Sequence, residues 1–418
     1  MPDNLSLDAY LFFSTRIVRL FAYGFLSVVL ALYLAEVGLA EAQIGLLLTL
    51  TLVGDTAISL WITTHADRIG RRRMLALGAI LMVFAGILFA LTRDFYLLLL
   101  AATIGVISPS GYEVGPFLSI EQAGLSQLIP GERRTQVFAW YNLVGSFATA
   151  LGALCGGGLA QLLSETGMTP LGSYRVVVMG YAALGIALLA LFARLSHSVE
   201  TPASVPDIAQ TVTSNGRALL GLGRSQQVVL RLAALFSLDA FAGGFVIQSM
   251  VAYWFHLRFG VEPALLGGIF FGANILAGIS ALSAAHLAAR FGLINTMVFT
   301  HIPSNVLLML VPLMPNLGLA IAVLLLRFSI SQMDVPTRQS YTMAVVDPAE
   351  RSAAAGVTGT ARTIGASLSP VIAGSLLANP ALLGAPFLIS GGLKIVYDLA
   401  LYRSFQALKP PEELKVSD

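Results

Sequence analysis

Apolar runs of about 20 residues follow one another along almost the whole chain, and no other feature restricts its fold as strongly. Of its 418 residues, 56% are hydrophobic and 11% are charged, whereas soluble domains carry about 25% charged residues. Backbone N–H and C=O groups find no partners in lipid, so a spanning segment must satisfy them internally, as a helix does. The chain is therefore predicted to be an all-α integral membrane protein.

Twelve such runs can be delimited, six in each half of the chain. In the first half they cover residues 10–35, 43–64, 74–92, 95–127, 136–163 and 174–195. In the second half they cover residues 228–256, 264–286, 294–313, 317–343, 353–378 and 385–405. The fourth run is too long for a straight span and contains Pro109, Gly111, Gly115 and Pro116, so we expect it to be tilted, broken or extended into the cytoplasm.

A polar stretch at residues 196–227 separates the two sets of runs. It contains Pro202, Pro206 and several Ser, Thr and Asn residues, a composition typical of a linker. We predict an N-terminal six-helix bundle at residues 1–195, a linker at 196–227 and a C-terminal six-helix bundle at 228–418.

The charged residues of the loops predict the orientation of these helices. The sequence His-Ala-Asp-Arg-Ile-Gly-Arg-Arg-Arg-Met at 65–74 lies between the second and third runs, and short loops rich in Lys and Arg stay on the cytoplasmic side. Most other basic loop residues fall on the same side, and the opposite side carries Arg93, Arg175 and Arg258. We therefore expect both termini in the cytoplasm and a location in the cell (inner) membrane.

The same loop resembles the signature loop between helices 2 and 3 of the major facilitator superfamily, Gly-x-Leu-Ala-Asp-Arg-x-Gly-Arg-Lys. Asp67, Arg68, Gly70, Arg71 and Arg72 match that pattern. The resemblance implies a cytoplasmic gate formed by these five residues and Glu121. In this gate Asp67 would face the backbone amides near residues 353–356, and Arg71 would contact Glu121. The alternative is a cluster that only fixes topology.

The two halves also resemble each other. Residues 22–25 recur in altered form at 242–245, and residues 66–70 recur at 288–292 without the acid. Together with a third echo after the fourth and tenth runs, they indicate a duplicated unit. In the superfamily that the chain resembles, such a duplication implies two pseudo-symmetric six-helix bundles that alternate access to a site near the middle of the membrane.

Charged residues inside the apolar runs are the candidates for the transport site, since a charge at mid-bilayer costs at least about 2.5 to 3.5 kcal/mol. Those nearest the middle are Arg19, Glu113, Asp239, Arg327 and Asp334. We expect them to line a cavity for substrate or protons, with purely structural ion pairs as the alternative. Arg19 and Asp239 fall at equivalent positions of the repeat, so we predict them as the coupling pair.

Four other charged positions inside the apolar runs have a different interpretation. Arg16 fits a cavity role and a role at the helix end equally well, and the sequence does not show which way Asp55 faces. Lys394 and Asp398 stand four residues apart on one helix, so we predict that they neutralise each other.

The sequence favours transport over catalysis. It contains neither a phosphate-binding Gly-rich loop followed by Lys and Ser or Thr nor paired histidines at metal-ligand spacing, so we predict no enzyme activity and no cofactor. Its basic residues lie in loops, which argues against a nucleic-acid partner. Glycines in the fifth and eleventh runs slightly favour export, because they resemble a motif of efflux members.

We therefore predict a monomeric secondary transporter for proton-coupled efflux of a small organic compound. Uptake of a metabolite or organic ion is the alternative, and a sensor or scaffold without transport activity is a remote one.

The orientation is testable by cysteine labelling. A cysteine introduced at Arg72 should resist a membrane-impermeant maleimide added to intact cells and should react after permeabilisation, because its loop is predicted to face the cytoplasm. A cysteine at Arg93, on the opposite side, is the matched control and should react in intact cells. Strong labelling at position 72 in intact cells would overturn both the orientation and the helix count behind it.

Overall fold

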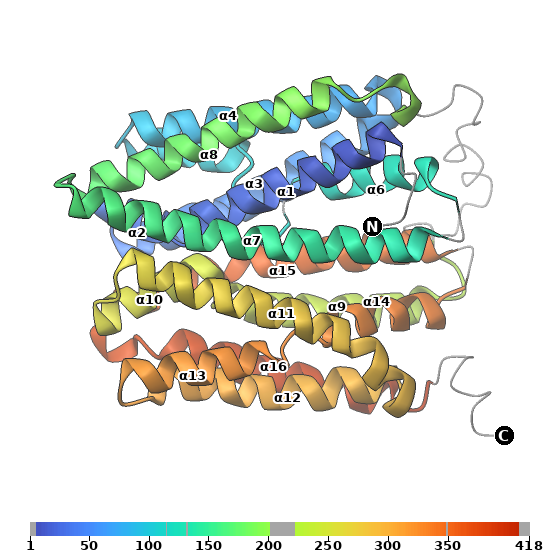
Figure 1. Cartoon of the computed structure of the whole chain (residues 1–418). Helices are drawn as coiled ribbons and strands as arrows, with labels where there is room; N and C mark the ends of the chain where they lie inside the picture. Colours follow the sequence, from blue (N-terminus) through green and yellow to red (C-terminus); the bar gives the residue numbers. More distant parts are fainter. Residues whose placement is uncertain (1–5, 114, 131–132, 201–221, 348–349, 409–418) are drawn as a thin grey trace. The chain divides into compact units, whose positions relative to one another are not determined.

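The computed structural model describes residues 6–113, 115–130, 133–200, 222–347 and 350–408, and all regular elements within them are helices (Figure 1). The helices of the first half are α1 (Leu7–Ser27), α2 (Leu30–Val37), α3 (Glu41–Ile69), α4 (Arg71–Leu91), α5 (Phe95–Ile104), α6 (Phe117–Leu128), α7 (Arg134–Glu165) and α8 (Pro170–Ala193). Those of the second half are α9 (Gln226–Gly244), α10 (Gln248–Phe259), α11 (Pro263–Phe291), α12 (Leu293–Leu310), α13 (Leu317–Phe328), α14 (Asp334–Val345), α15 (Arg351–Leu377) and α16 (Ala385–Phe405).

Among the described residues, eight helical segments are long and apolar enough to cross a membrane, and α1 with α2 makes a ninth if the bent pair is one span. Helices α9 and α10 count there as the single segment Gln226–Phe259. The fourth, tenth and eleventh predicted runs do not pass the same test. The fourth and tenth are each divided into two short helices, and the eleventh, α15, is rich in Gly, Ser and Thr.

The fourth run is broken, as the sequence predicted. Helix α5 ends at Ile104 and α6 begins at Phe117. Pro109 and Pro116 cannot donate the backbone hydrogen bonds of a continuous helix, and Gly111 has a φ of 72°, a left-handed conformation that favours glycine. The break positions Glu113 on an irregular segment.

The chain divides into two compact units that do not coincide with the two halves of the sequence. The first unit comprises Met1–Ala203, Ile247–Ile275 and Pro370–Pro380. The second comprises Ser204–Val246, Leu276–Ser369 and Ala381–Asp418. The first unit therefore contains α1 to α8 together with α10, the first part of α11 and the last part of α15.

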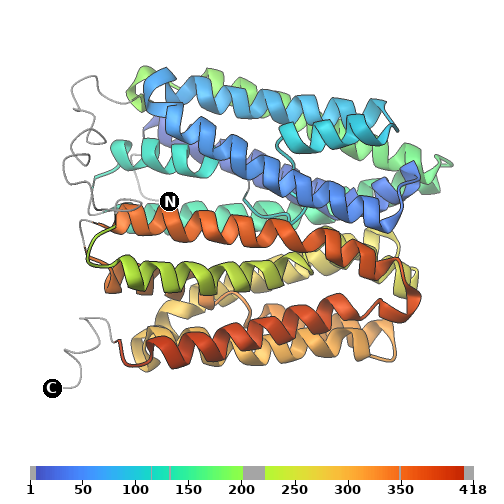
Figure 2. The same ribbon diagram turned by 180° about the vertical axis from the view of Figure 1, so that it is seen from behind.

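Small residues allow close helix packing in the first unit, where α1 and α7 run side by side (Figure 1). A Cβ atom built on Gly156 of α7 would lie 2.0 Å from the carbonyl oxygen of Phe25. Figure 2 shows the other side of this unit, where α5 packs against α3 and α4. Because lipid tails are as apolar as the side chains, such packing and interhelical hydrogen bonds hold the helices together, not the hydrophobic effect.

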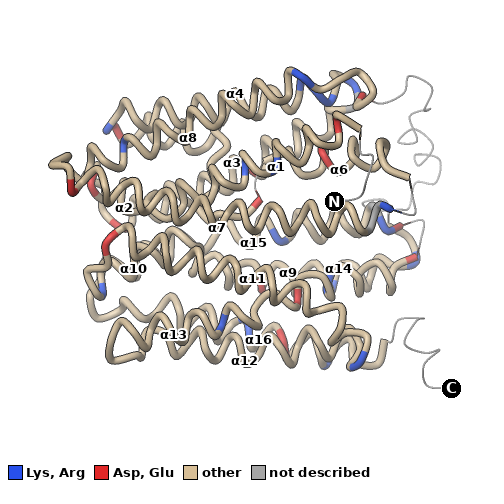
Figure 3. The backbone as a smooth tube through the Cα atoms, in the orientation of Figure 1, with Lys and Arg blue, Asp and Glu red and all other residues tan. Residues whose placement is uncertain are grey.

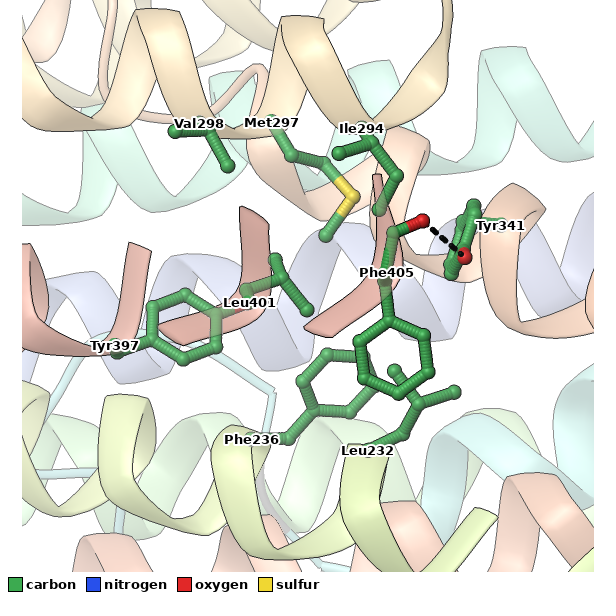
Figure 4. Packing of buried hydrophobic residues seen from close by; sticks show 9 residues of the cluster. All are labelled: Leu232, Phe236, Ile294, Met297, Val298, Tyr341, Tyr397, Leu401 and Phe405. Atoms are coloured by element: carbon green, nitrogen blue, oxygen red, sulfur yellow. Dashed lines mark hydrogen bonds between the residues drawn. The ribbon is translucent and has the colours of Figure 1, made fainter. Parts of the chain in front are cut away.

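The second unit has an apolar cluster between α9, α12, α14 and α16. Its buried members, shown in Figure 4, are Leu232, Phe236, Ile294, Met297, Val298, Tyr341, Tyr397, Leu401 and Phe405. The hydroxyl of Tyr341 donates to the carbonyl oxygens of Leu408 at 2.9 Å and of Phe405 at 3.4 Å. The cluster thus ties the end of α16 to α14.

The close approach of α1 and α7 predicts a position-specific packing defect. Gly156→Ala should lower the midpoint of thermal unfolding by several degrees, since the added methyl group meets a backbone carbonyl and overpacking costs about 1–3 kcal/mol. Gly158→Ala, two residues away with no atom within 4 Å of the built Cβ, is the matched control and should not be destabilised. Equal midpoints for the two detergent-purified variants would contradict the packing described here.

Candidate functional site

Charged residues are sparse along the helices (Figure 3), and in the first unit a group of them surrounds Arg19 of α1, whose side chain is fully buried. Its two terminal nitrogens donate to the two carboxylate oxygens of Glu121 on α6, both at 2.7 Å. Its Nε donates to Glu113 at 2.8 Å. A two-pronged contact of this kind is the strongest form of an Arg–carboxylate pair.

Further partners complete this cluster. Thr15 donates to Glu121 at 2.7 Å, and the Tyr141 hydroxyl of α7 donates to the same carboxylate. Arg16 pairs with Glu113, and its guanidinium lies 4.5 Å from the centre of the Tyr141 ring. Two arginines therefore face two glutamates, and the formal charges of these four groups cancel. Arg16, which the sequence left open, belongs to the cluster.

In the second unit the charges are arranged around an acid. Asp239 of α9 is 3% exposed and accepts hydrogen bonds from three basic side chains on three other helices. Lys394 of α16 donates at 2.6 Å to one oxygen. Arg338 of α14 and Arg362 of α15 donate to the other at 3.2 and 3.1 Å. Asp334 accepts from Arg338 at 2.9 Å, so a hydrogen-bonded network links α9, α14, α15 and α16.

A second buried acid lies one helical turn beyond Lys394. Asp398 of α16 is 1% exposed. One of its oxygens is 2.8 Å from Nδ1 of His301, and the other accepts from Asn305 at 3.1 Å, both residues being on α12. The predicted mutual pair of Lys394 and Asp398 is therefore wrong, because Lys394 bonds Asp239 and Asp398 bonds His301.

The structure also does not pair Arg19 with Asp239, the two residues that the sequence predicted as a coupling pair. Arg19 has Glu113 and Glu121 as partners in the first unit, and Asp239 has three basic partners in the second. Each residue meets the need for a counter-charge within its own unit.

The remaining predicted cavity residue, Arg327, lies half-buried in the last turn of α13, with its guanidinium 5.0 Å from the centre of the Phe328 ring. Asp55, whose direction the sequence left open, is buried on α3 and accepts from Ser59 at 3.4 Å.

The arginine-rich loop between α3 and α4 is held by an acid that the sequence did not suggest. Glu200 accepts from the backbone amides of Arg71 at 2.6 Å and Arg72 at 3.3 Å, at the N-terminus of α4. A carboxylate there also interacts favourably with the helix dipole. Gly70 joins α3 to α4 with a φ of 113°, which explains why the turn needs glycine.

Two contacts implied for the gate can be compared with the structure. The Arg71 guanidinium donates to the carbonyl oxygen of Val199 at 3.3 Å, and Glu121 is committed to Arg19, Thr15 and Tyr141 and not to Arg71. The side chain of Asp67 lies outside the described part of the chain.

A matching acid, Glu350, caps α9 in the second unit. Its carboxylate accepts from the amides of Arg224 and Ser225, both at 3.0 Å. Desolvation opposes ionisation, but the hydrogen bonds from Ser225, Gly223 and Arg224 prevail and lower the pKa of Glu350. This cap is therefore present at neutral pH and is lost as the pH falls through that lowered pKa.

Sequence reasoning missed several members of these clusters. Tyr141, Thr15 and His301 are ordinary helix residues in the sequence, and Arg338 and Arg362 were not among the predicted site residues. The usable signal was the presence of any ionisable residue inside an apolar run. That signal identifies Lys394 and Asp398 as buried groups and Arg362 as a partly buried one, but it does not say which helix supplies each partner.

Comparison with known proteins shows which family this chain resembles. Residues 12–414 match the family model of the Major Facilitator Superfamily. The chain is 32% identical over 419 residues to an uncharacterized membrane protein of Saccharomyces cerevisiae, covering 95% of this chain and 93% of that one. It is also 25% identical over 174 residues to the quinolone resistance protein NorA of Staphylococcus aureus, a match that spans 42% of this chain and 41% of NorA.

Solved structures share the fold at low sequence identity. The D-xylose-proton symporter superimposes with a TM-score of 0.74 at 15% identity, covering 94% of this chain and 97% of that one. The nucleoside transporter NupG gives a TM-score of 0.67 at 14% identity, covering 96% and 100%.

The cluster around Arg19 predicts a strong stability effect. Arg19→Met should lower the free energy of unfolding by about 3–5 kcal/mol, because it leaves buried carboxylates without a counter-charge. Adding Glu121→Gln should restore part of the loss, since it removes one of those charges. Arg93→Met, at an exposed position, serves as the control. Thermal unfolding of the purified variants measures the effect, and an Arg19→Met protein as stable as the wild type would contradict the burial and pairing of this residue.

Proposed function

The chain belongs to the Major Facilitator Superfamily, and we propose that it is a secondary active transporter that exports a small organic compound by alternating access, with protons as the coupling ion. The proposed topology has twelve spans in two six-helix bundles, with domains at residues 1–195 and 228–418 and both termini in the cytoplasm. The proposed membrane is the cell (inner) membrane.

The single observation that supports proton coupling best is the environment of Asp239. One carboxylate accepts hydrogen bonds from Lys394, Arg338 and Arg362, so it joins α9 to three other helices. The three cations stabilise the charged form of Asp239, so a proton can bind only when some of these bonds open, and it then removes the negative charge that the cations share. Protonation would thus loosen four helices at once, which is the kind of two-state element that a transport cycle requires.

The three basic side chains around Asp239 differ in their exposure. The side chain of Arg362 is 34% exposed, whereas those of Arg338 and Lys394 are 7% and 10% exposed. Arg362 is therefore the group in the network that a compound would meet first. In the first unit the corresponding group is Glu113, which is 15% exposed while Arg19 and Glu121 are fully buried. We propose Glu113 and Arg362 as the substrate-facing members of the two clusters.

Arg68, Gly70, Arg71 and Arg72 are proposed as parts of the cytoplasmic gate, together with Asp67. The capping of α4 by Glu200 supports a structural role for the start of this helix, because it fixes the turn in which these residues lie. Glu121 is proposed as part of the Arg19 cluster instead of the gate.

The direction of transport is proposed from the partial similarity to the quinolone resistance protein NorA. Uptake of an organic anion is the second candidate, and the three cations around Asp239 favour it. An anion and the carboxylate of Asp239 compete for the same cations, so a proton on Asp239 would promote anion binding. Proton and anion would then move in the same direction.

The proposed function is tested by growth and flux. Cells that express the protein should tolerate higher concentrations of some members of a panel of toxic compounds that includes quinolones.

In proteoliposomes, Asp239→Asn should abolish accumulation driven by a pH gradient while downhill exchange of the same compound continues, because the carboxylate that binds the proton is gone. Asp94→Asn, which keeps a helix-capping side chain at the start of α5, is the control and should retain wild-type accumulation.

Accumulation in Asp239→Asn with an unchanged pH profile would remove Asp239 from the coupling mechanism. Accumulation in the opposite direction, inward with protons, would support the uptake alternative.

A further inference from the structure

His301 and Asp398 form a buried pair that neither the repeat nor the proposed transport site requires. They come from α12 and α16, and their side chains are 5% and 1% exposed. Asn305, which is fully buried, donates to the second oxygen of Asp398 at 3.1 Å. An ionisable pair in this position is costly unless it has a use, since apolar residues would pack α12 against α16 without the cost of dehydrating a charge.

We propose that His301 and Asp398 bind a proton and are electrically coupled to Asp239, so that they form a second protonation site of the transport cycle. The inference rests on the proposed function in one respect only, in that it assigns the second site to the same cycle. The ligand is the proton, and the residue that changes charge is His301, the side chain whose ordinary titration range is closest to neutral pH.

The connection to Asp239 runs through Lys394. Lys394 lies one turn before Asp398 on α16, and its ammonium group donates to Asp239 at 2.6 Å. A Cβ built on Gly243 of α9 would have only the end of the Lys394 side chain within 4 Å, at 3.7 and 3.8 Å. Lys394 thus bonds one acid and stands one turn from the other on the same helix, so the charge on the His301–Asp398 pair acts on the ammonium that Asp239 binds.

The charge balance of this region explains why the two sites must respond to each other. Counting the bonded groups, Asp239, Asp334 and Asp398 carry three negative charges, and Arg338, Arg362 and Lys394 carry three positive ones. With neutral His301 the sum is zero, and with protonated His301 it is +1. A net charge in a medium of low dielectric constant is unfavourable. Protonation of His301 is therefore linked to any event that changes the charge at Asp239.

All elements packed against α12 contribute to this balance. Helix α16 provides Asp398, Lys394 and the ring of Tyr397, whose centre is 6.1 Å from that of His301. Helix α14 provides Asp334 and Arg338, and α13 provides Arg327, half-buried over the ring of Phe328. The bonded network therefore comprises Asp239, Asp334, Arg338, Arg362, Lys394 and Asp398 beside His301, and Arg327 is a further charged residue on α13, which packs against α12.

Buried hydroxyl groups extend the polar zone along the same two helices. Ser304 of α12 and Ser390 of α16 are fully buried, and within the described part of the chain their hydroxyls have no hydrogen-bond partner. Asn305 Oδ1 has none there either. Ordered water commonly binds buried polar groups of this kind. The α12–α16 contact is thus polar over more than one helical turn, as a proton-binding site within a membrane requires.

The test observes the proton directly and needs no transported compound. The full chain, labelled with ¹⁵N-histidine and reconstituted in nanodiscs, is titrated from about pH 5 to 9 by NMR. The chain has five histidines, and His301 is assigned by the signal that disappears in His301→Gln. We expect this signal to titrate. Its midpoint should move to lower pH in Asp239→Asn, which removes a nearby negative charge, and to higher pH in Lys394→Gln, which removes a positive one.

The expected movement is at least one pH unit, a tenfold change in proton affinity. His256 is the internal control, because it lies in the first unit with its Nδ1 3.0 Å from the carbonyl oxygen of Val261. Its signal should be unchanged in both variants, which shows that the first unit remains folded, and unchanged thermal unfolding of the variants tests the second unit.

Either of two results would overturn the inference. The first is a His301 signal that shows a single protonation state throughout the titration. The second is a midpoint that is the same in wild type, Asp239→Asn and Lys394→Gln. A failure of pH-driven flux with opposite midpoint shifts intact would instead remove the proposed function and support the coupling between the two sites.

Discussion

Neutralisation of charge in a medium of low dielectric constant is the constraint on which the rest of the structure depends. An isolated charge within the membrane costs several kcal/mol, so each buried ionisable side chain must find partners nearby. In this protein the counter-charges come from the same unit. Arg16 and Arg19 face Glu113 and Glu121 in one unit, and Asp239 faces three basic side chains in the other.

The two clusters have central residues of opposite charge, Arg19 in one and Asp239 in the other. Arg19 is a permanent cation held by two acids, whereas Asp239 is a titratable acid held by three bases. A proton can neutralise an acid, but an arginine stays charged at any physiological pH. The first cluster is thus suited to hold α1, α6 and α7 together, and the second is suited to change its bonding when a proton arrives. The two units therefore differ in what their buried charges can do chemically.

The sequence predicted the features that depend on composition along one segment. The all-helical membrane fold, the break in the fourth run near Pro109 and the importance of charges inside apolar runs follow from counting residues over about 20 positions. Pairing depends on the rotation of each helix about its axis, which the sequence does not provide. Lys394 and Asp398 illustrate the difference, since four-residue spacing predicts a contact within α16, and partners on α9 and α12 compete for both side chains. Glu200 was missed because an acid after a helix has no distinctive pattern.

Among the residues that the structure describes, the segments of the second half that belong to the first unit contact it without ion pairs. A Cβ built on Gly157 of α7 would lie 2.2 Å from the carbonyl oxygen of Pro263, and one on Gly45 of α3 would lie 2.4 Å from that of Pro370. Ser249 donates through its amide and its hydroxyl to the carbonyl oxygen of Pro109. If these surfaces part during a cycle, water can replace every hydrogen bond that is lost, and no ion is stripped of its counter-ion. Opening at these contacts would then expose backbone carbonyls to water and break hydrogen bonds instead of salt bridges.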